Sequence, residues 1–384
     1  MLWRNYVFRR GIAVHDMWDR SYEDREVRLL YIAGRGFDSR AVQVLRSFMD
    51  GLSSGACQPS SAELLLVGFT GYELDSTLQA QTEINAKVLE QLFSAIGSVD
   101  AVTFGSSAAG EDDLSASNAL RIGTEQVLAR IKDHTDIVLD VSSFPRVVYL
   151  ALMTGILRRL VADRDAPGAL AAGGVNFQVL VGEDAALDAQ IRSEDPSNDL
   201  VLIPGYSSAL HAESVQDWPL VWFPILGENR VAQFEKVMAT IPENAEICPV
   251  LPHPSRDPRR ADKLLVEYRR SLFDTGKAPT SNIIYAHENH PFEAYRQLLQ
   301  AMRRYRDSLR IVGGCRLVMT PLASKLITLG AGLSCFDMRP HRQEDDYGVA
   351  IPYAEPTRYI ASTGTLNASK PVISSLLLTG SAYS

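Results

Sequence analysis

Two patterns of hydrophobic residues alternate along the first half of the chain. Short apolar runs predict strands, and apolar residues repeated every three or four positions predict helices. The predicted strands cover 29–33, 63–69, 101–104, 136–141 and 176–181. The predicted helices cover 39–49, 78–96, 117–131 and 144–161. This regular alternation favours a parallel sheet with helices on both faces.

The second half repeats the same order of patterns. Its predicted strands cover 221–226, 246–250, 282–285, 316–319 and 348–353. Its predicted helices cover 230–241, 257–273, 291–305 and 322–336. Loop-rich sequence at 162–174 and 183–198 separates the halves. We therefore expect an α/β protein of two tandem Rossmann-like halves with parallel central sheets, an N-terminal domain at 1–204 and a C-terminal domain at 205–384.

Composition narrows the classes of function. The 384 residues carry a formal net charge of −8, which disfavours direct nucleic-acid binding because such binding depends on clustered Lys and Arg. The four cysteines are scattered without a CxxC pair, so we expect free thiols and no metal site. No apolar run reaches the roughly 20 residues of a membrane span. A cytoplasmic protein without a membrane contact or a bound cofactor is the expectation.

The turn after the first strand, GRGFDSR, has features of a ligand-binding loop. Its glycines permit a tight turn, and Asp38 or Ser39 is placed to cap the next helix. Free helix amides favour an anion, which nearby arginines would also attract. The candidate ligand-binding residues here are Gly34, Arg35, Gly36, Asp38 and Arg40. A tight turn that binds no ligand is the alternative.

Two later strand ends share a pattern of hydroxyl, proline and cation. The first is DVSSFPR at 140–146 and the second is TPLASK at 320–325. A cation in the first turn of a helix opposes the helix dipole, a conflict that a bound anion relieves. The candidate ligand-binding residues are Ser142, Ser143 and Arg146 in the first segment and Thr320, Ser324 and Lys325 in the second.

Two further loops carry polar residues. The proline-rich segment 253–260 offers His253 and Arg256 as candidate anion ligands, and a proline-shaped loop with an ordinary basic helix start is the alternative. The segment HENH at 287–290 lacks the HExxH spacing of a zinc protease. We expect Asn289 or His290 to cap the helix that starts near Pro291.

The C-terminal segment 372–379 is apolar and uncharged. Left free it would promote aggregation, so we expect it to be ordered. It would either form an edge strand of its own domain or dock on a partner, and the second interpretation predicts an oligomer or complex.

The duplicated halves, with SSFPR at one strand end and TPLASK at the equivalent end, resemble the CRISPR-associated Rossmann fold (CARF) ligand-binding family. At a coarser level they are similar to the SAVED sensors of bacterial antiviral defence. The resemblance implies binding of cyclic or linear oligonucleotide second messengers at 34–40 and at Ser324 and Lys325. Ala323 stands where the family has a glycine before the hydroxyl and lysine pair.

Two hypotheses of function follow, with a structural subunit of a larger complex as a third. The first is a nucleotide-binding sensor or scaffold that acts through a protein partner or homo-oligomer. The second is an α/β enzyme acting on a phosphorylated or nucleotide substrate. Its candidate acid and base groups are Asp38, Asp140, His253, Glu288 and His290.

Overall fold

The computed structural model describes residues 1–23, 25–55, 57–105, 116–188, 190–197, 199–274, 281–339 and 348–384. The chain forms two compact units, one of Met1–Glu194 with Thr357–Ser384 and one of Asp195–Pro356. This division differs from the expected domains 1–204 and 205–384, because the C-terminal residues return to the first unit. The chain passes between the units through β7 (Arg192–Pro196) and β16 (Pro356–Ile360), which pair with each other.

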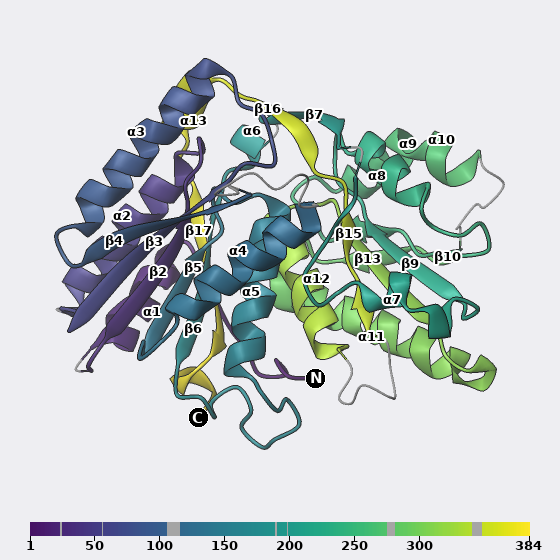
Figure 1. Ribbon diagram of the computed structural model, residues 1–384, viewed down its shortest axis with the longest axis horizontal. Coiled ribbons are helices and arrows are strands. Elements are labelled where there is room, and N and C mark those ends of the chain that lie inside the picture. Colours follow the sequence, from purple (N-terminus) through teal and green to yellow (C-terminus); the bar gives the residue numbers. More distant parts are fainter. Residues whose placement is uncertain are drawn as a thin grey trace. The chain divides into compact units, whose positions relative to one another are not determined.

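The first unit is built on a seven-stranded sheet in the order β1-β17-β6-β5-β2-β3-β4 (Figure 1). Strands β6, β5, β2, β3 and β4 run parallel, as the sequence predicted. The strands are β1 (Val7–Arg10), β2 (Arg28–Gly34), β3 (Ser61–Phe69), β4 (Ser98–Phe104), β5 (Asp136–Asp140), β6 (Asn176–Glu183) and β17 (Val372–Thr379). The sheet is therefore Rossmann-like in its parallel part, with β17 and β1 added antiparallel.

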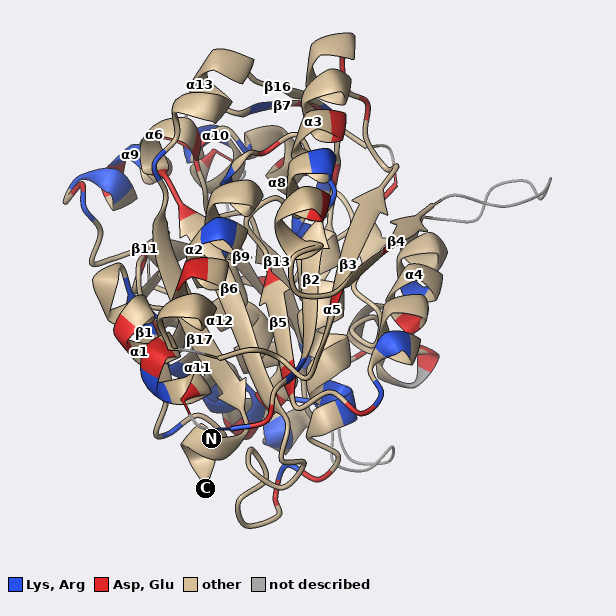
Figure 2. Cartoon of the chain, turned by 90° about the vertical axis from the view of Figure 1, so that its left-hand side faces the viewer, with Lys and Arg blue, Asp and Glu red and all other residues tan. Residues whose placement is uncertain are grey.

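Helices cover both faces of this sheet (Figure 1). On one face lie α1 (Ile12–Tyr22), α2 (Arg40–Ser54) and α3 (Ser76–Phe93), and on the other lie α4 (Ala116–Arg130) and α5 (Arg146–Leu160). The short helices are α6 (Ala185–Asp188) and α13 (Thr363–Ala368). Acidic and basic residues are interspersed along α3 and α4 (Figure 2). These two helices present no surface of a single charge.

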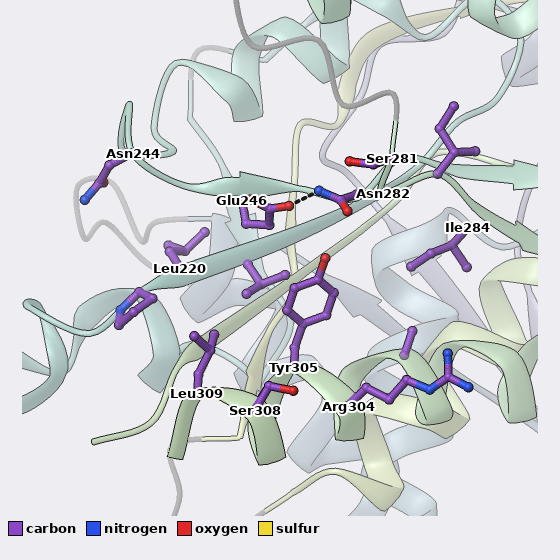
Figure 3. Close-up of a pocket in the computed structure, with 14 residues that line it drawn as sticks. Leu220, Asn244, Glu246, Ser281, Asn282, Ile284, Arg304, Tyr305, Ser308 and Leu309 are labelled. Atoms are coloured by element: carbon purple, nitrogen blue, oxygen red, sulfur yellow. Dashed lines mark hydrogen bonds between the residues drawn. The ribbon is translucent and has the colours of Figure 1, made fainter. Parts of the chain in front are cut away.

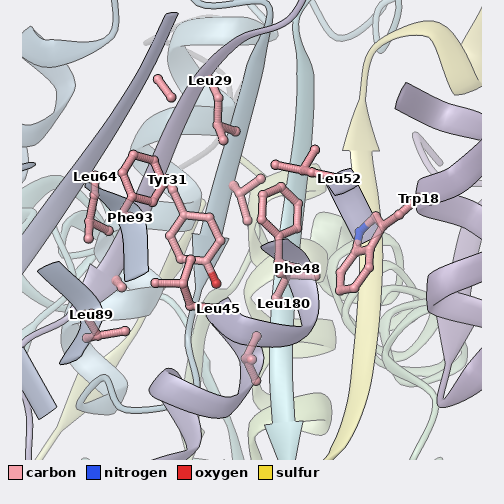
Figure 4. Close-up of a cluster of buried hydrophobic side chains, with 14 of the residues drawn as sticks. Trp18, Leu29, Tyr31, Leu45, Phe48, Leu52, Leu64, Leu89, Phe93 and Leu180 are labelled. Carbon is pink, nitrogen blue, oxygen red and sulfur yellow. The ribbon is translucent and has the colours of Figure 1, made fainter. Parts of the chain in front are cut away.

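Alternate residues of β2 point to opposite faces, as in any strand. Leu29 and Tyr31 enter a buried hydrophobic cluster with residues of α1, α2 and α3 (Figure 4). Within it the Trp18 and Phe48 rings meet edge to face, with centroids 5.3 Å apart. Burial of such large side chains contributes about 1.5–3 kcal/mol each. This cluster fixes α2, and with it the turn that precedes α2.

The C-terminal strand β17 lies inside the sheet, between β1 and β6. Its neighbours are Val7–Arg10 on one side and Phe177–Glu183 on the other, and the buried indole of Trp3 donates to the carbonyl of Leu378 at 2.9 Å. The expectation of an edge strand or a partner-docking tail is wrong, because β1 covers its outer edge. The apolar tail thus no longer supports an oligomer.

The second unit contains a smaller parallel sheet in the order β12-β11-β9-β13-β14, with β10 also paired to β9 (Figure 1). Its strands are β9 (Leu220–Ile225), β10 (Glu246–Ile247), β11 (Val250–Pro252), β12 (Ile284–Ala286), β13 (Arg316–Pro321) and β14 (Val349–Ala350). A separate antiparallel pair joins β8 (Val201–Leu202) and β15 (Pro352–Tyr353). The single strand expected at 348–353 is therefore divided between two sheets.

The helices of the second unit follow its strands in the expected order. They are α7 (Ser208–His211), α8 (Val231–Met238), α9 (Arg260–Glu267), α10 (Arg269–Phe273), α11 (Pro291–Leu309) and α12 (Lys325–Asp337). The structure divides the helix expected at 257–273 into α9 and α10. Across the described ranges, no helix combines the length and apolar character that crossing a membrane requires.

Candidate functional site

The strand order of the first unit creates a switch point between β2 and β5. From β2 the chain moves outward through β3 to β4 and then returns to β5 on the other side of β2. Ala33 pairs with Asp140, so the two strands end at the same level. In open α/β sheets, ligands bind at the carboxyl ends of strands at such a point. The two loops named from the sequence, 34–40 and 140–146, lie there together.

Ser143 joins these two loops. Its hydroxyl donates to the carbonyl of Gly34 at 2.9 Å, and its own carbonyl oxygen lies 3.2 Å from where a Cβ on Gly36 would stand. A Cβ on Gly34 would lie only 2.6 Å from the Ser143 Oγ. The Asn85 side chain donates to the Gly36 carbonyl at 3.0 Å from the other side. The close approach of the loops therefore leaves no room for a side chain at Gly34 and little room for one at Gly36.

Asp140 and Ser142 anchor the end of β5. Asp140 is fully buried and accepts hydrogen bonds from the Tyr31 hydroxyl at 3.2 Å and the Ser142 amide at 2.9 Å. The Ser142 hydroxyl donates to Asp140 and accepts from the Gly182 amide at 2.8 Å. Burial, together with the adjacent Asp140 carboxylate, raises the pKa of Tyr31 well above its ordinary value. These hydrogen bonds hold the start of the loop after β5 in place and link β2, β5 and β6.

Asp38 and Arg40 form a buried ion pair at the start of α2. Their closest approach is 2.6 Å, Arg40 is 2% exposed, and Asp188 supplies a second carboxylate at 2.8 Å. Burial alone would lower the pKa of Arg40, but the two carboxylates raise it above its ordinary value. The charge of Arg40 is thus compensated within the protein, which gives both residues a structural function in this state.

The two helices that begin at the switch point differ at their first amides, because at α2 the Arg40 amide donates to the Asp38 carboxylate at 3.1 Å. Pro145 precedes α5, Ser39 precedes α2, and neither side chain bonds to its helix. The Ser39 hydroxyl instead donates to the Leu366 carbonyl, so of the two residues expected to cap α2 it is Asp38, and not Ser39, that bonds to the helix start. By contrast, Asp75 caps α3 by accepting from the Leu78 amide at 2.8 Å.

Two cations accompany these helix starts. Arg146 is the half-buried first residue of α5. Arg35 forms an exposed ion pair with Glu83 at 2.7 Å. Exposed pairs of this kind contribute little in water, about 0–1 kcal/mol. Arg35 is therefore able to exchange Glu83 for another anion at small cost.

The second unit has an equivalent switch point between β9 and β13. Ile225 pairs with Pro321, and β9 continues into a turn at Gly227. A Cβ on Gly227 would lie 2.2 Å from the Leu322 carbonyl oxygen and 2.9 Å from the Ala323 Cα. In both units, therefore, a glycine turn packs closely on a neighbouring loop: the turn after β2 on the loop after β5, and the turn after β9 on the loop after β13.

The three candidates on this second loop have different environments. Thr320 is fully buried and accepts from the Trp222 indole at 2.9 Å, so we leave it out of the proposed site. Ser324 occupies the cap position of α12 without a side-chain bond to the helix, and Lys325 is the half-buried first residue of α12. Within the part of the chain that the structure describes, the enclosed hydroxyls of Ser324 and Thr328 have no hydrogen-bond partner.

Arg260, the first residue of α9, lies in the segment 253–260 but was not named there as a candidate ligand. It bonds to Glu228 through two atoms, the longer contact being 2.7 Å, and also to Glu288. Burial alone would lower the pKa of Arg260, but these carboxylates raise it. Its neighbours His253 and Arg256 are exposed. The enzyme candidate Glu288 therefore lies in an ion pair.

His290 caps α11. It is one of the two residues, Asn289 and His290, that the sequence predicted for this function. Its Nδ1 accepts from the Glu293 amide at 3.3 Å, and Pro291 follows at the first helical position. The His287 ring lies nearby, with centroids 5.7 Å apart. Among the residues with described positions, no three His, Cys, Asp or Glu gather as metal ligands would.

No known protein family matches the chain, and no curated protein matches it either. Two solved structures show weak similarity. One is the cytoplasmic domain of a prokaryotic cation chloride cotransporter, with 9% identity, a TM-score of 0.23 and coverage of 87% of this chain and 98% of that one. The other is a phosphoglycerate mutase of Leishmania mexicana, with 9% identity, a TM-score of 0.28 and coverage of 94% and 72%. At these scores neither bears on function.

Proposed function

We propose that the chain is a cytoplasmic sensor or scaffold that binds a phosphorylated small molecule of the nucleotide class and acts through a protein partner or homo-oligomer. The observation that supports this most is the contact of Ser143 with Gly34 at the β2–β5 switch point. It holds the start of α5, which has no capping side chain, at the edge where this architecture receives ligands.

The physical argument concerns an anion. The first amides of a helix carry a partial positive charge and bind phosphate when no side chain caps them. At α5 the preceding residue is Pro145, which has no capping side chain, and Arg146 follows at once. A phosphate there would receive amide hydrogen bonds from the helix and a charged contact from Arg146, with Arg35 exchanging Glu83 for the ligand.

The second unit offers a similar edge in its own right. Ser324 and Lys325 begin α12 beside the Gly227 turn, and the Ser324 hydroxyl is enclosed without a protein partner among described residues. A phosphate oxygen would satisfy that hydroxyl. We propose one phosphate-binding edge in each unit, each formed by the residues of that unit alone.

Mass spectrometry of small molecules released from the purified, denatured chain tests the ligand class directly. Calorimetric titration with cyclic and linear oligoadenylates and with mononucleotides then measures affinity. Arg146→Ala and Lys325→Ala should each weaken binding by about 1.5–3 kcal/mol, the scale of charge-assisted hydrogen bonds. Arg121→Ala is the matched control, because Arg121 is exposed and bonds only to Glu125 and Asn118 of its own helix α4 among the described side chains. Equal affinities for all four proteins would contradict the proposal.

A further inference from the structure

A cavity of about 580 Å³ opens at the amino-terminal edge of the second unit's sheet (Figure 3). Its walls include Leu220 and Glu246, the first residues of β9 and β10, and Leu309, the last residue of α11. Small-molecule sites typically occupy about 300–1,000 Å³. The cavity is therefore large enough for a ligand, and it lies at the opposite strand ends from Gly227 and Ser324.

Polar groups gather at one end of this cavity. The Asn282 side chain donates to the Glu246 carboxylate, and Figure 3 shows the Tyr305 hydroxyl pointing toward this pair. That hydroxyl accepts from the Cys248 thiol at 3.1 Å. Burial raises the pKa of Tyr305, so the hydroxyl keeps its proton. This end thus presents a carboxylate acceptor and a hydroxyl donor.

The remaining walls combine aliphatic side chains with three neutral polar residues, Asn244, Ser281 and Ser308, and one cation. Leu220, Ile284 and Leu309 supply aliphatic surface. Arg304 lines the cavity one residue before Tyr305 and is exposed. Across the described ranges its guanidinium has no ion-pair or hydrogen-bond partner. An exposed arginine beside aliphatic walls is suited to a ligand that combines a flat apolar ring with a negative charge.

We propose that this cavity binds a flat aromatic acid, with its ring between the aliphatic walls, a ring N–H donated to Glu246 and its anionic group at Arg304. The ring would pack against the aliphatic walls, and its N–H would donate to the Glu246 carboxylate. The anion takes the guanidinium of Arg304. This site is separate from the phosphate-binding edges and does not depend on the proposed function.

Three probes of similar size separate these contacts in calorimetric titrations of the full chain. Indole-3-acetate carries the ring N–H and the carboxylate, 1-naphthaleneacetate lacks the N–H, and tryptamine replaces the acid by a cation. We expect saturable binding of indole-3-acetate, weaker binding of 1-naphthaleneacetate and the weakest binding of tryptamine. Absence of saturable binding by all three at millimolar concentration would overturn the proposal, and a preference for tryptamine would overturn the assignment of an acid.

Substitutions then locate the binding. Arg304→Gln should weaken indole-3-acetate about tenfold, which corresponds to ~1.4 kcal/mol. Ala301→Trp, which fills the cavity from α11, should abolish binding. Arg310→Gln and Gln300→Trp are matched controls at exposed positions outside the cavity lining, and both should bind as the parent does. If Arg304→Gln and Ala301→Trp both bind as the controls do, the probe lies elsewhere and the site assignment is wrong.

Discussion

The Ser143 hydroxyl donates a hydrogen bond to the carbonyl of Gly34 at 2.9 Å, across the gap between two strand ends that are far apart in the sequence. This single contact brings the loop after β5 onto the loop after β2. It leaves no room for a side chain at Gly34, where an added Cβ would lie 2.6 Å from the same hydroxyl oxygen. The geometry of the proposed binding edge therefore depends on a pair of residues rather than on a glycine motif.

Gly34→Ala tests this dependence. We expect it to lower the free energy of unfolding by about 1–3 kcal/mol, because overpacking displaces Ser143 and the Phe144 ring, which lies 3.2 Å from the added Cβ. The double variant Gly34→Ala with Ser143→Gly should recover part of the loss. Gly173→Ala is the control, since its nearest contact would be 3.4 Å. Urea denaturation measures all four proteins, and equal losses in the two single glycine variants would contradict the packing argument.

Removal of one partner of the buried Asp38–Arg40 pair should be strongly destabilising. Asp38→Asn is expected to cost about 3–5 kcal/mol, because the enclosed guanidinium loses its closest carboxylate. The double variant Asp38→Asn with Arg40→Met should be more stable than Asp38→Asn alone. In the exposed Arg121–Glu125 pair, Glu125→Gln should cost less than about 1 kcal/mol. Thermal and urea unfolding give both values, and similar losses in the two pairs would refute the buried-charge explanation.

The His290 cap predicts a pH dependence of stability. Burial lowers the pKa of His290, the nearby Glu293 raises it, and His287 lowers it, with a net decrease. In the unfolded chain His290 has a pKa of about 6.5, so below that pH it binds a proton that the folded chain does not yet bind. The free energy of unfolding therefore falls as the pH decreases from about 6.5 toward the lower pKa of folded His290. Above this window the contribution is complete. Protonation of Nδ1 also removes the acceptor for the Glu293 amide.

His290→Asn provides the comparison, because asparagine caps helices well and does not titrate. The variant should keep most of its stability at neutral pH, and its stability should decrease less than that of the parent as the pH falls below about 6.5. Unfolding free energies measured in urea at several pH values test this. An unchanged slope in the variant would show that other groups, such as His134, whose pKa burial also lowers, cause the dependence.

The strands and helices on either side of the two switch points could be predicted from hydrophobic spacing, because local patterns determine them. Contacts between residues distant in the sequence could not be predicted in this way. The ion pair of Arg40 with Asp188 depends on folding of the whole unit, so the sequence favoured Arg40 as a ligand-binding residue. The hydrophobic pattern placed Thr320 just after the end of its strand, but β13 continues to Pro321. The Thr320 hydroxyl is buried and accepts from the Trp222 indole. An error of two residues in a strand boundary thus changes a candidate ligand contact into a core hydrogen bond.

The C-terminal strand should stabilise the first unit rather than an assembly. Leu376 is fully buried in β17, between β1 and β6, so Leu376→Ala should cost about 2–5 kcal/mol through lost burial and a remaining cavity. Val372→Ala, at the more exposed start of the strand, is the control and should cost much less. A chain shortened to residue 362 should lose cooperative unfolding of the first unit, because the interior position of its sheet is emptied. Calorimetry and light scattering distinguish the outcomes. If the shortened chain unfolds as cooperatively as the full chain and differs only in molecular mass, the strand belongs to an interface and the arrangement of β17 within the sheet is wrong.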